Sequence, residues 1–176
     1  MGEVRPGKGT WENAAAFAYD VYEGFQGKEQ TVAVSIDLEG AYNRVQFKLL
    51  MDLFIQYGVS LTLTRCVAGA LLGRTVVIQL GKWSSAPPQL TMGLPHGSPL
   101  SPVLFGVYTE GLADLNQNRP SKIHTLANGG LMYKTSKDSQ EAAEAVQYQV
   151  DSVFKWCHNT GSLINPDKKH TLWCTL

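Results

Sequence analysis

The sequence has little cysteine, with only Cys66, Cys157 and Cys174 among its 176 residues. The number is odd and no pair has CxxC spacing, so the sequence supports neither a disulfide framework nor a common zinc motif. An alternative is a zinc site made of Cys157, His158, His170 and Cys174, which the adjacency of the first two residues disfavours. The favoured interpretation is reduced thiols in a reducing compartment.

Long apolar runs and an excess of charge are also missing. No apolar run approaches the roughly 18 residues that cross a membrane. The first eight residues are polar and glycine-rich, unlike a secretory signal, so we expect an intracellular protein, in either nucleus or cytoplasm. Fifteen Lys and Arg balance fifteen Asp and Glu. A nucleic-acid partner would therefore need a local basic patch, because net charge does not indicate one.

The length fits one domain with a core of its own. Apolar periodicity and turn residues predict helices and strands in mixed order, which is an α+β pattern. The predicted helices cover residues 10–24, 40–57, 61–72, 98–115 and 139–160, and the predicted strands cover 31–36, 74–80, 83–90, 123–127, 131–134 and 171–175. Thr10 and Ser98 are the expected N-caps of two of these helices.

Asp37 directly follows the predicted strand 31–36. A carboxylate at the end of a buried strand is costly unless it binds something. The alternative is that Asp37 caps the following helix. The strand and the helix by themselves leave both interpretations open.

Four segments resemble motifs of reverse transcriptases. Residues 36–45, IDLEGAYNRV, resemble motif A, and residues 93–105, GLPHGSPLSPVLF, resemble motif B. Residues 163–168, LINPDK, resemble motif D, and residues 5–10, RPGKGT, resemble the stretch that precedes motif A in non-LTR elements. The order is that of the family, over nearly the whole chain. The chain is therefore similar to the reverse-transcriptase domain of a non-LTR, jockey-like retrotransposon, a transposable element.

The resemblance implies an α+β fold with an antiparallel sheet packed on helices, the reverse-transcriptase palm with part of the fingers. Residues 1–176 would form a single partial domain, with the palm core at about 31–176. The thumb and the endonuclease would lie outside it.

The resemblance also implies an RNA-directed DNA polymerase, a nucleotidyltransferase that extends a DNA primer on an RNA template. Such enzymes use two Mg²⁺ ions to stabilise the attacking and leaving oxygens. Asp37 would be the motif A metal ligand, with the carbonyl of Leu38 close by. Tyr42 occupies the position of the steric gate, which excludes a ribose 2′-hydroxyl.

Motifs B and D supply the remaining expected site residues. Gly97 and Ser98 would face template and nucleotide, and Lys168 would lie near the leaving pyrophosphate. His96 stands where the family usually has glutamine. The other histidines, His124, His158 and His170, are expected to be ordinary surface or half-buried residues.

Motif C departs from the family. The matching segment, residues 126–131, is LANGGL where the family has two consecutive aspartates. Asn128 and Gly129 replace them, so Asp37 is the only remaining carboxylate of the expected three. We predict that Mg²⁺ binds weakly or not at all and that this copy is a pseudoenzyme that does not polymerise. Asn-Gly still favours a hairpin turn, so the fold is expected to survive.

Two other functions remain open. The chain could be a non-catalytic remnant that binds nucleic acid or protein, or a folded relic with no selected role. If fingers and thumb are absent, faces that they normally cover would be exposed, and large apolar patches favour self-association.

Overall fold

The computed structural model describes residues 10–115, 120–126 and 129–176. They form two compact units. The first, here called the sheet unit, contains residues 10–41 and 109–176, and the second, the hairpin unit, contains residues 42–108.

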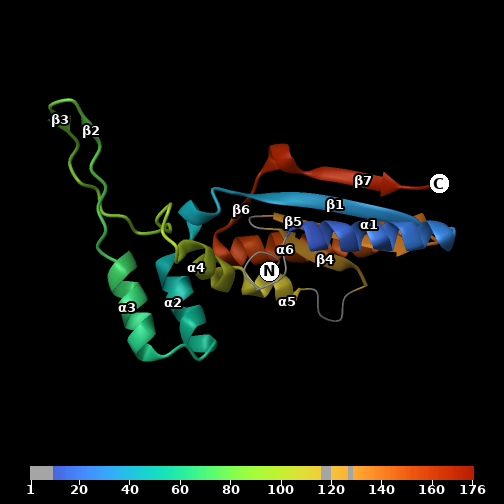
Figure 1. Cartoon of the computed structure of the whole chain (residues 1–176), viewed down its shortest axis with the longest axis horizontal. Coiled ribbons are helices and arrows are strands. Elements are labelled where there is room, and N and C mark those ends of the chain that lie inside the picture. The colour runs from blue at the N-terminus through green and yellow to red at the C-terminus, as the bar shows by residue number, and fades with distance from the viewer. Residues whose placement is uncertain (1–9, 116–119, 127–128) are drawn as a thin grey trace. The chain divides into compact units, whose positions relative to one another are not determined.

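The sheet unit is an antiparallel sheet with helices packed on it (Figure 1). The strand order is β4-β5-β1-β6, and β7 also pairs with β1. Its elements are α1 (Thr10–Gln26), β1 (Gln30–Glu39), α5 (Glu110–Asp114), β4 (Lys122–Leu126), β5 (Gly129–Ser136), α6 (Ser139–Thr160), β6 (Leu163–Ile164), η2 (Pro166–Lys168) and β7 (His170–Cys174).

β1 is the central strand. On one edge it pairs with β5 over residues 30–37. On the other edge it pairs with β7 over residues 31–35 and with β6 over residues 38–39. The short helix η2 therefore joins two segments that are both fixed to the same edge of β1.

Helices cover both faces of this sheet. Tyr133 is 1% exposed and contacts Phe17 of α1 edge to face, with ring centroids 4.9 Å apart. The neighbouring residue Met132 is fully buried, and it points to the opposite face because side chains alternate along a strand. α6 runs along that opposite face and contributes buried residues such as Val146 and Val153.

The helix predicted at residues 139–160 is confirmed. The side chain of Asp138 accepts hydrogen bonds from the backbone N–H groups of Gln140 and Glu141, which satisfies two of the free donors at the helix start. Gly161 ends the helix in the left-handed conformation, at φ 70°.

The hairpin unit contains three α-helices and a β-hairpin. Its elements are η1 (Tyr42–Arg44), α2 (Phe47–Gln56), α3 (Leu61–Leu71), β2 (Gln79–Leu80), β3 (Trp83–Ser84) and α4 (Ser101–Tyr108). α2 packs against both α3 and α4. Leu50 and Phe54 of α2, Leu71 of α3 and Leu104 of α4 are buried.

The α+β fold with an antiparallel sheet on helices is confirmed, but several element boundaries were predicted wrongly. β1 continues two residues past Asp37 because β6 pairs with Leu38 and Glu39. Asp37 is therefore inside a strand and caps no helix, and Glu39 is the last residue of that strand. Gly40 turns the chain at φ 56°, and an α-helix starts only at Phe47.

Other predicted elements are shorter than expected. The strands predicted at 74–80 and 83–90 contain two residues each, with one isolated bridge between Thr75 and Gln89. The helix predicted from Ser98 begins at Ser101 and is interrupted at Thr109. Pro102 fits this later start because proline is tolerated in the first turn of a helix.

Within the part of the chain that the structure describes, no helix has the length and apolar character needed to cross a bilayer.

Candidate functional site

Asp37 lies on the central strand of the sheet unit, with its side chain 20% exposed. Its partner across the antiparallel pairing with β5 is Gly129. Directly opposed residues of an antiparallel pair place their side chains on the same face, about 5 Å apart at Cβ. Gly129 has no side chain, so this face carries one carboxylate where two opposed aspartates would carry two.

Lys168 reaches Asp37 from the other edge of β1. Its ammonium nitrogen lies 3.1 Å from Oδ2 of Asp37. The turn that carries Lys168 is fixed by backbone hydrogen bonds. The N–H of Asn165 donates to the carbonyl of Asp37 at 2.8 Å, and the N–H of Lys168 donates to the carbonyl of Asn165 at 3.3 Å. The side chain of Asn165 also accepts from the N–H of Asp167.

In the hairpin unit, Tyr42 lies between two rings of the motif B segment. Its ring centroid is 5.2 Å from that of Phe105 and 5.9 Å from that of His96. Nε2 of His96 lies 2.8 Å from Oδ1 of Asn43, the residue after Tyr42. The expected gate residue and the histidine that replaces the usual glutamine are therefore neighbours.

The backbone holds these two segments together. The N–H of Gly93 donates to the carbonyl of Val45, and the N–H of Leu94 donates to the carbonyl of Tyr42, both at 2.9 Å. The hydroxyl of Ser101 donates to the carbonyl of Pro95 at 2.7 Å. These contacts keep the motif A turn and the motif B loop in one fixed arrangement.

Gly97 and Ser98 belong to the same loop. Gly97 is exposed and has φ 82°, and nothing lies within 4 Å of the place where a Cβ would be. The hydroxyl of Ser98 accepts a hydrogen bond from the N–H of Leu100.

Arg74 also supports the motif B loop. Its guanidinium donates to the carbonyl of Gly93 and, at 3.0 Å, to the carbonyl of Leu71. It also lies over the ring of Phe47, 5.4 Å from the centroid. This cation is engaged within the protein, so it is a poor candidate for binding phosphate.

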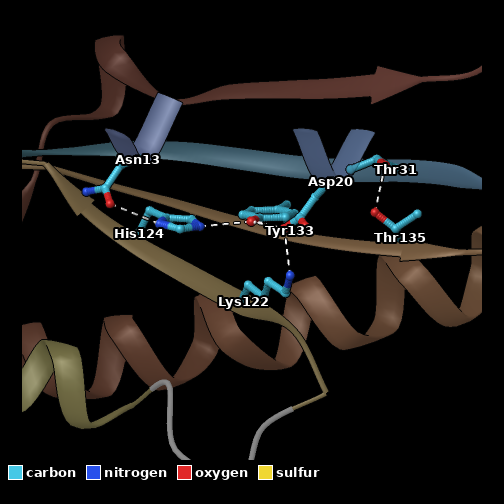
Figure 2. A network of polar contacts seen from close by, with 7 residues as sticks. All are labelled: Asn13, Asp20, Thr31, Lys122, His124, Tyr133 and Thr135. Carbon is cyan, nitrogen blue, oxygen red and sulfur yellow. Dashed lines mark hydrogen bonds and ion pairs between the residues drawn. The ribbon is translucent and has the colours of Figure 1, made fainter. Parts of the chain in front are cut away.

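A polar network connects α1 to β4 and β5 (Figure 2). The hydroxyl of Tyr133 donates to Oδ2 of Asp20 at 2.5 Å and lies 2.8 Å from Nε2 of His124. Lys122 donates to the same carboxylate oxygen at 2.6 Å. Nδ1 of His124 lies 3.2 Å from Oδ1 of Asn13, whose amide donates to the carbonyl of Thr125.

The network shifts the pKa values of its members. Burial raises the pKa of Asp20, but the hydrogen bonds from Lys122 and Tyr133 outweigh burial and hold this pKa below its ordinary value. Burial lowers the pKa of His124, and the charge of Asp20 only partly opposes this effect. Burial and the hydrogen bond to Asp20 raise the pKa of Tyr133. The network therefore contains an ionised Asp20 and a neutral Tyr133 at neutral pH.

The sequence did not single out this network, and His124 was expected only to be an ordinary surface or half-buried histidine. Two spacings could have indicated it. Asn13 and Asp20 are seven residues apart, on one face of a helix. Lys122 and His124 are two residues apart, on one face of a strand.

Comparison with known proteins decides the family. The profile described as Reverse transcriptase (RNA-dependent DNA polymerase) matches residues 3–174. The chain belongs to this family. Its similarity to non-LTR elements is also confirmed, since it resembles three curated polymerases of Drosophila melanogaster mobile elements.

These reverse transcriptases are distant relatives and much longer proteins. The probable RNA-directed DNA polymerase from transposon BS is 27% identical over 175 residues, which is 93% of this chain and 18% of the relative. The RNA-directed DNA polymerase from mobile element jockey is 25% identical over 169 residues, which is 91% of this chain and 18% of the relative. The chain thus spans less than a fifth of the length of these relatives.

Solved telomerase structures have the same fold. Apo telomerase from Candida tropicalis, truncated from its C-terminal domain, superposes with a TM-score of 0.67 at 10% identity, over 94% of this chain and 35% of that one. Telomerase from Candida tropicalis in complex with a TWJ fragment of telomeric RNA gives a TM-score of 0.70 at 10% identity, over 94% of this chain and 30% of that one.

The described residues around Asp37 do not fit the Mg²⁺ ions that the reverse transcriptase family implies. Mg²⁺ prefers near-octahedral oxygen ligands, chiefly carboxylates. Gly129 offers none, and the ammonium of Lys168 already lies on the carboxylate of Asp37. Glu39 is on the same face of β1 two residues further on, and it is exposed. Residues 10–115, 120–126 and 129–176 contain no group of three or more His, Cys, Asp or Glu side chains that could hold a metal ion.

The predicted reverse-transcriptase site residues fall into two groups. Asp37, Leu38, Gly129 and Lys168 come together in the sheet unit, and Leu38 is buried at 3% exposure. Tyr42, His96, Gly97 and Ser98 lie within the hairpin unit. Asn128 lies outside the described residues. The considered zinc set does not form a cluster in the described part of the chain, and burial raises the pKa of the Cys157 thiol to about 11.

Proposed function

We propose that this reverse-transcriptase chain binds nucleic acid without polymerising deoxynucleotides. The observation that carries the proposal is the pairing of Asp37 with Gly129 on one side and with Lys168 on the other. Two-metal catalysis of phosphoryl transfer needs several anionic oxygens around both ions. With the motif C aspartates replaced, this chain keeps one of the three family carboxylates, so it is an ancestral polymerase domain that has lost its chemistry.

Nucleic acid is the proposed partner because the chain belongs to the reverse transcriptase family. The relatives are described as RNA-directed DNA polymerases, and one of the telomerases with this fold is in complex with RNA. The motif A turn and the motif B loop remain joined by backbone hydrogen bonds in this chain. Retention of that arrangement supports binding of a template. Mg²⁺ would contribute little to the affinity for it.

Primer extension on an RNA template tests the loss of activity. The chain is compared with an Asn128→Asp, Gly129→Asp double variant, in Mg²⁺ and in Mn²⁺. We expect no extension by the chain itself. Extension by the double variant alone would assign the loss to motif C, whereas extension by the unmodified chain would refute the proposal.

Binding to an RNA–DNA hybrid is measured separately, by fluorescence anisotropy at several salt concentrations. Phosphate contacts release counterions, so the logarithm of the binding constant should fall linearly with the logarithm of salt concentration. Absence of binding at low salt would remove nucleic acid as the partner.

We also propose that the chain self-associates through the hairpin unit. Val77, Ile78, Leu80 and Trp83 are each more than half exposed around the β2–β3 hairpin. A cluster of large exposed apolar side chains favours burial against another surface. Phosphate binding does not explain this apolar cluster, so the cluster favours a contact with another protein surface.

A further inference from the structure

We infer that the ammonium of Lys168 takes the place of a divalent cation at Asp37, so that this edge of the sheet carries its own counter-charge and binds no Mg²⁺ there. The inference rests on the proposed function, because both assign the loss of chemistry to the surroundings of Asp37. It goes further, because it assigns a role to Lys168 that is independent of nucleotides.

The turn that carries Lys168 is closely positioned by the strands on either side of it. β6 pairs with residues 38–39 of β1 and β7 pairs with residues 31–35, on the same edge. The helix η2 crosses the interval between these two pairings, beside Asp37. The hydrogen bond from the N–H of Asn165 to the carbonyl of Asp37 fixes the turn at that residue. The backbone of Lys168 is therefore held beside Asp37 by contacts on both sides, and its side chain, 62% exposed, extends from there to the carboxylate.

The charges at this edge of the sheet favour the same pairing. The side chain of Asp37 is only 20% exposed, so its charge is partly withdrawn from water and favours a nearby cation. Gly129 adds no charge on the opposed strand, so one ammonium is enough to balance the one carboxylate. A divalent ion at the same oxygen would have to displace Lys168 or be repelled by it.

The ammonium and a divalent ion also differ in the ligands that they need. Mg²⁺ gives up its water ligands reluctantly and needs several protein oxygens to bind firmly. An ammonium needs only acceptor oxygens, and Oδ2 of Asp37 lies at 3.1 Å. Lys168 is also part of the chain, so no cation has to be recruited from solution.

Mn²⁺ titration followed by electron paramagnetic resonance tests the inference without nucleic acid. The variants are Asp37→Asn, Lys168→Met and the matched control Lys169→Met, which removes the neighbouring exposed lysine. We expect the unmodified chain, Asp37→Asn and Lys169→Met to bind Mn²⁺ equally weakly. Lys168→Met should bind about tenfold more tightly, since it removes an opposing unit charge from the same oxygen.

Two further variants keep the test decisive. Lys168→Gln is a second neutral replacement if Lys168→Met does not fold, which circular dichroism would show. Lys168→Arg keeps the positive charge and should bind Mn²⁺ as weakly as the unmodified chain. A Lys168→Met, Asn128→Asp, Gly129→Asp triple variant should bind more tightly than Lys168→Met by at least about tenfold.

The inference is overturned if the unmodified chain binds Mn²⁺, loses the binding with Asp37→Asn and keeps it unchanged with Lys168→Met. Loss of that binding with Glu39→Gln would then identify Glu39 as a second ligand. Mn²⁺ binding without primer extension would refute the inference and leave the proposed function standing. Primer extension by the unmodified chain would refute the proposed function, on which the inference rests.

Discussion

Gly129 is paired with Asp37 at the end of the antiparallel ladder between β1 and β5. An aspartate at position 129 would bring its carboxylate close to that of Asp37, on the same face of the sheet. Glycine avoids this repulsion, and Lys168 neutralises the carboxylate that remains. Both features favour a sheet that is stable without a bound cation.

The substitution Gly129→Asp should therefore destabilise the fold in the absence of divalent ions. Like charges directly opposed in a sheet cost about 0.2–1 kcal/mol, so we expect the free energy of unfolding to fall by about that amount relative to Gly129→Asn. Asparagine has the same size and no charge, which makes it the matched control. Urea unfolding at low salt measures the difference, and added salt should reduce it. Equal stability of the two variants would show that the charges do not interact.

The hydroxyl of Tyr133 should contribute measurably to stability. It contacts both Asp20 and His124, and the residue is 1% exposed. Tyr133→Phe leaves Nε2 of His124 without this partner and removes one of the two hydrogen bonds to Oδ2 of Asp20. A buried polar group that loses its partner costs about 1–3 kcal/mol. Tyr22→Phe, at a tyrosine that is 61% exposed, is the control and should have no effect in the same urea titration. An equal change in both variants would contradict the role of the network.

The structure of the sheet unit was partly predictable from local sequence. The limits of α6 follow from Asp138 and Gly161, which act on their own neighbours. β6 has only two residues and could not be found, since it exists through its pairing with Leu38 and Glu39 of a distant strand. The same pairing extends β1 past Asp37, which is why the alternative that Asp37 caps a helix does not hold.

The candidate site shows the same limit. Motif A and motif D could be found by resemblance, which assigned Lys168 to the leaving pyrophosphate. Its contact with Asp37 depends on how β6 and β7 pair with β1, which no local pattern encodes. The segment 40–46 was expected to be α-helical, but it contains only the short 3-10 helix η1. The backbone N–H groups of Gly93 and Leu94 donate to the carbonyls of Val45 and Tyr42 there, and these contacts come from a distant segment.

Protonation of His124 should make stability depend on pH. Burial lowers the pKa of His124 in the folded chain below the ordinary 6.5, so the unfolded chain binds the proton more readily. This contribution of His124 to the free energy of unfolding is complete above pH 6.5. It is lost as the pH falls from 6.5 through the pKa that His124 has in the folded chain. His124→Gln should weaken the pH dependence of the urea midpoint between pH 7.5 and pH 5. His158→Gln, at an exposed histidine, should leave that dependence unchanged. A rise in the free energy of unfolding on acidification would contradict a lowered pKa of His124.

Self-association should depend on the hairpin. We expect the double variant Leu80→Ser, Trp83→Ser to shift the chain towards monomer, with the association constant reduced by at least about tenfold. Full burial of a large apolar side chain is worth about 1.5–3 kcal/mol, so the loss of two explains this size. Trp11→Ser, at a 74% exposed tryptophan of α1, is the matched control. Sedimentation velocity measures all three proteins, and a monomeric unmodified chain would refute the contact.

Gly93 and Gly97 should respond differently to alanine, although both have positive φ. Gly93 has φ 93°, and a Cβ there would lie 3.1 Å from the carbonyl oxygen of Asn43. Gly97 has φ 82° and open space around it. Both variants incur the conformational cost of about 1–2 kcal/mol for a side chain in this region, but only Gly93→Ala also pushes the motif B loop away from the motif A turn. Gly93→Ala should therefore unfold at lower urea concentration than Gly97→Ala. Equal midpoints would mean that the loop moves freely from the turn, contrary to the hydrogen bonds that join them.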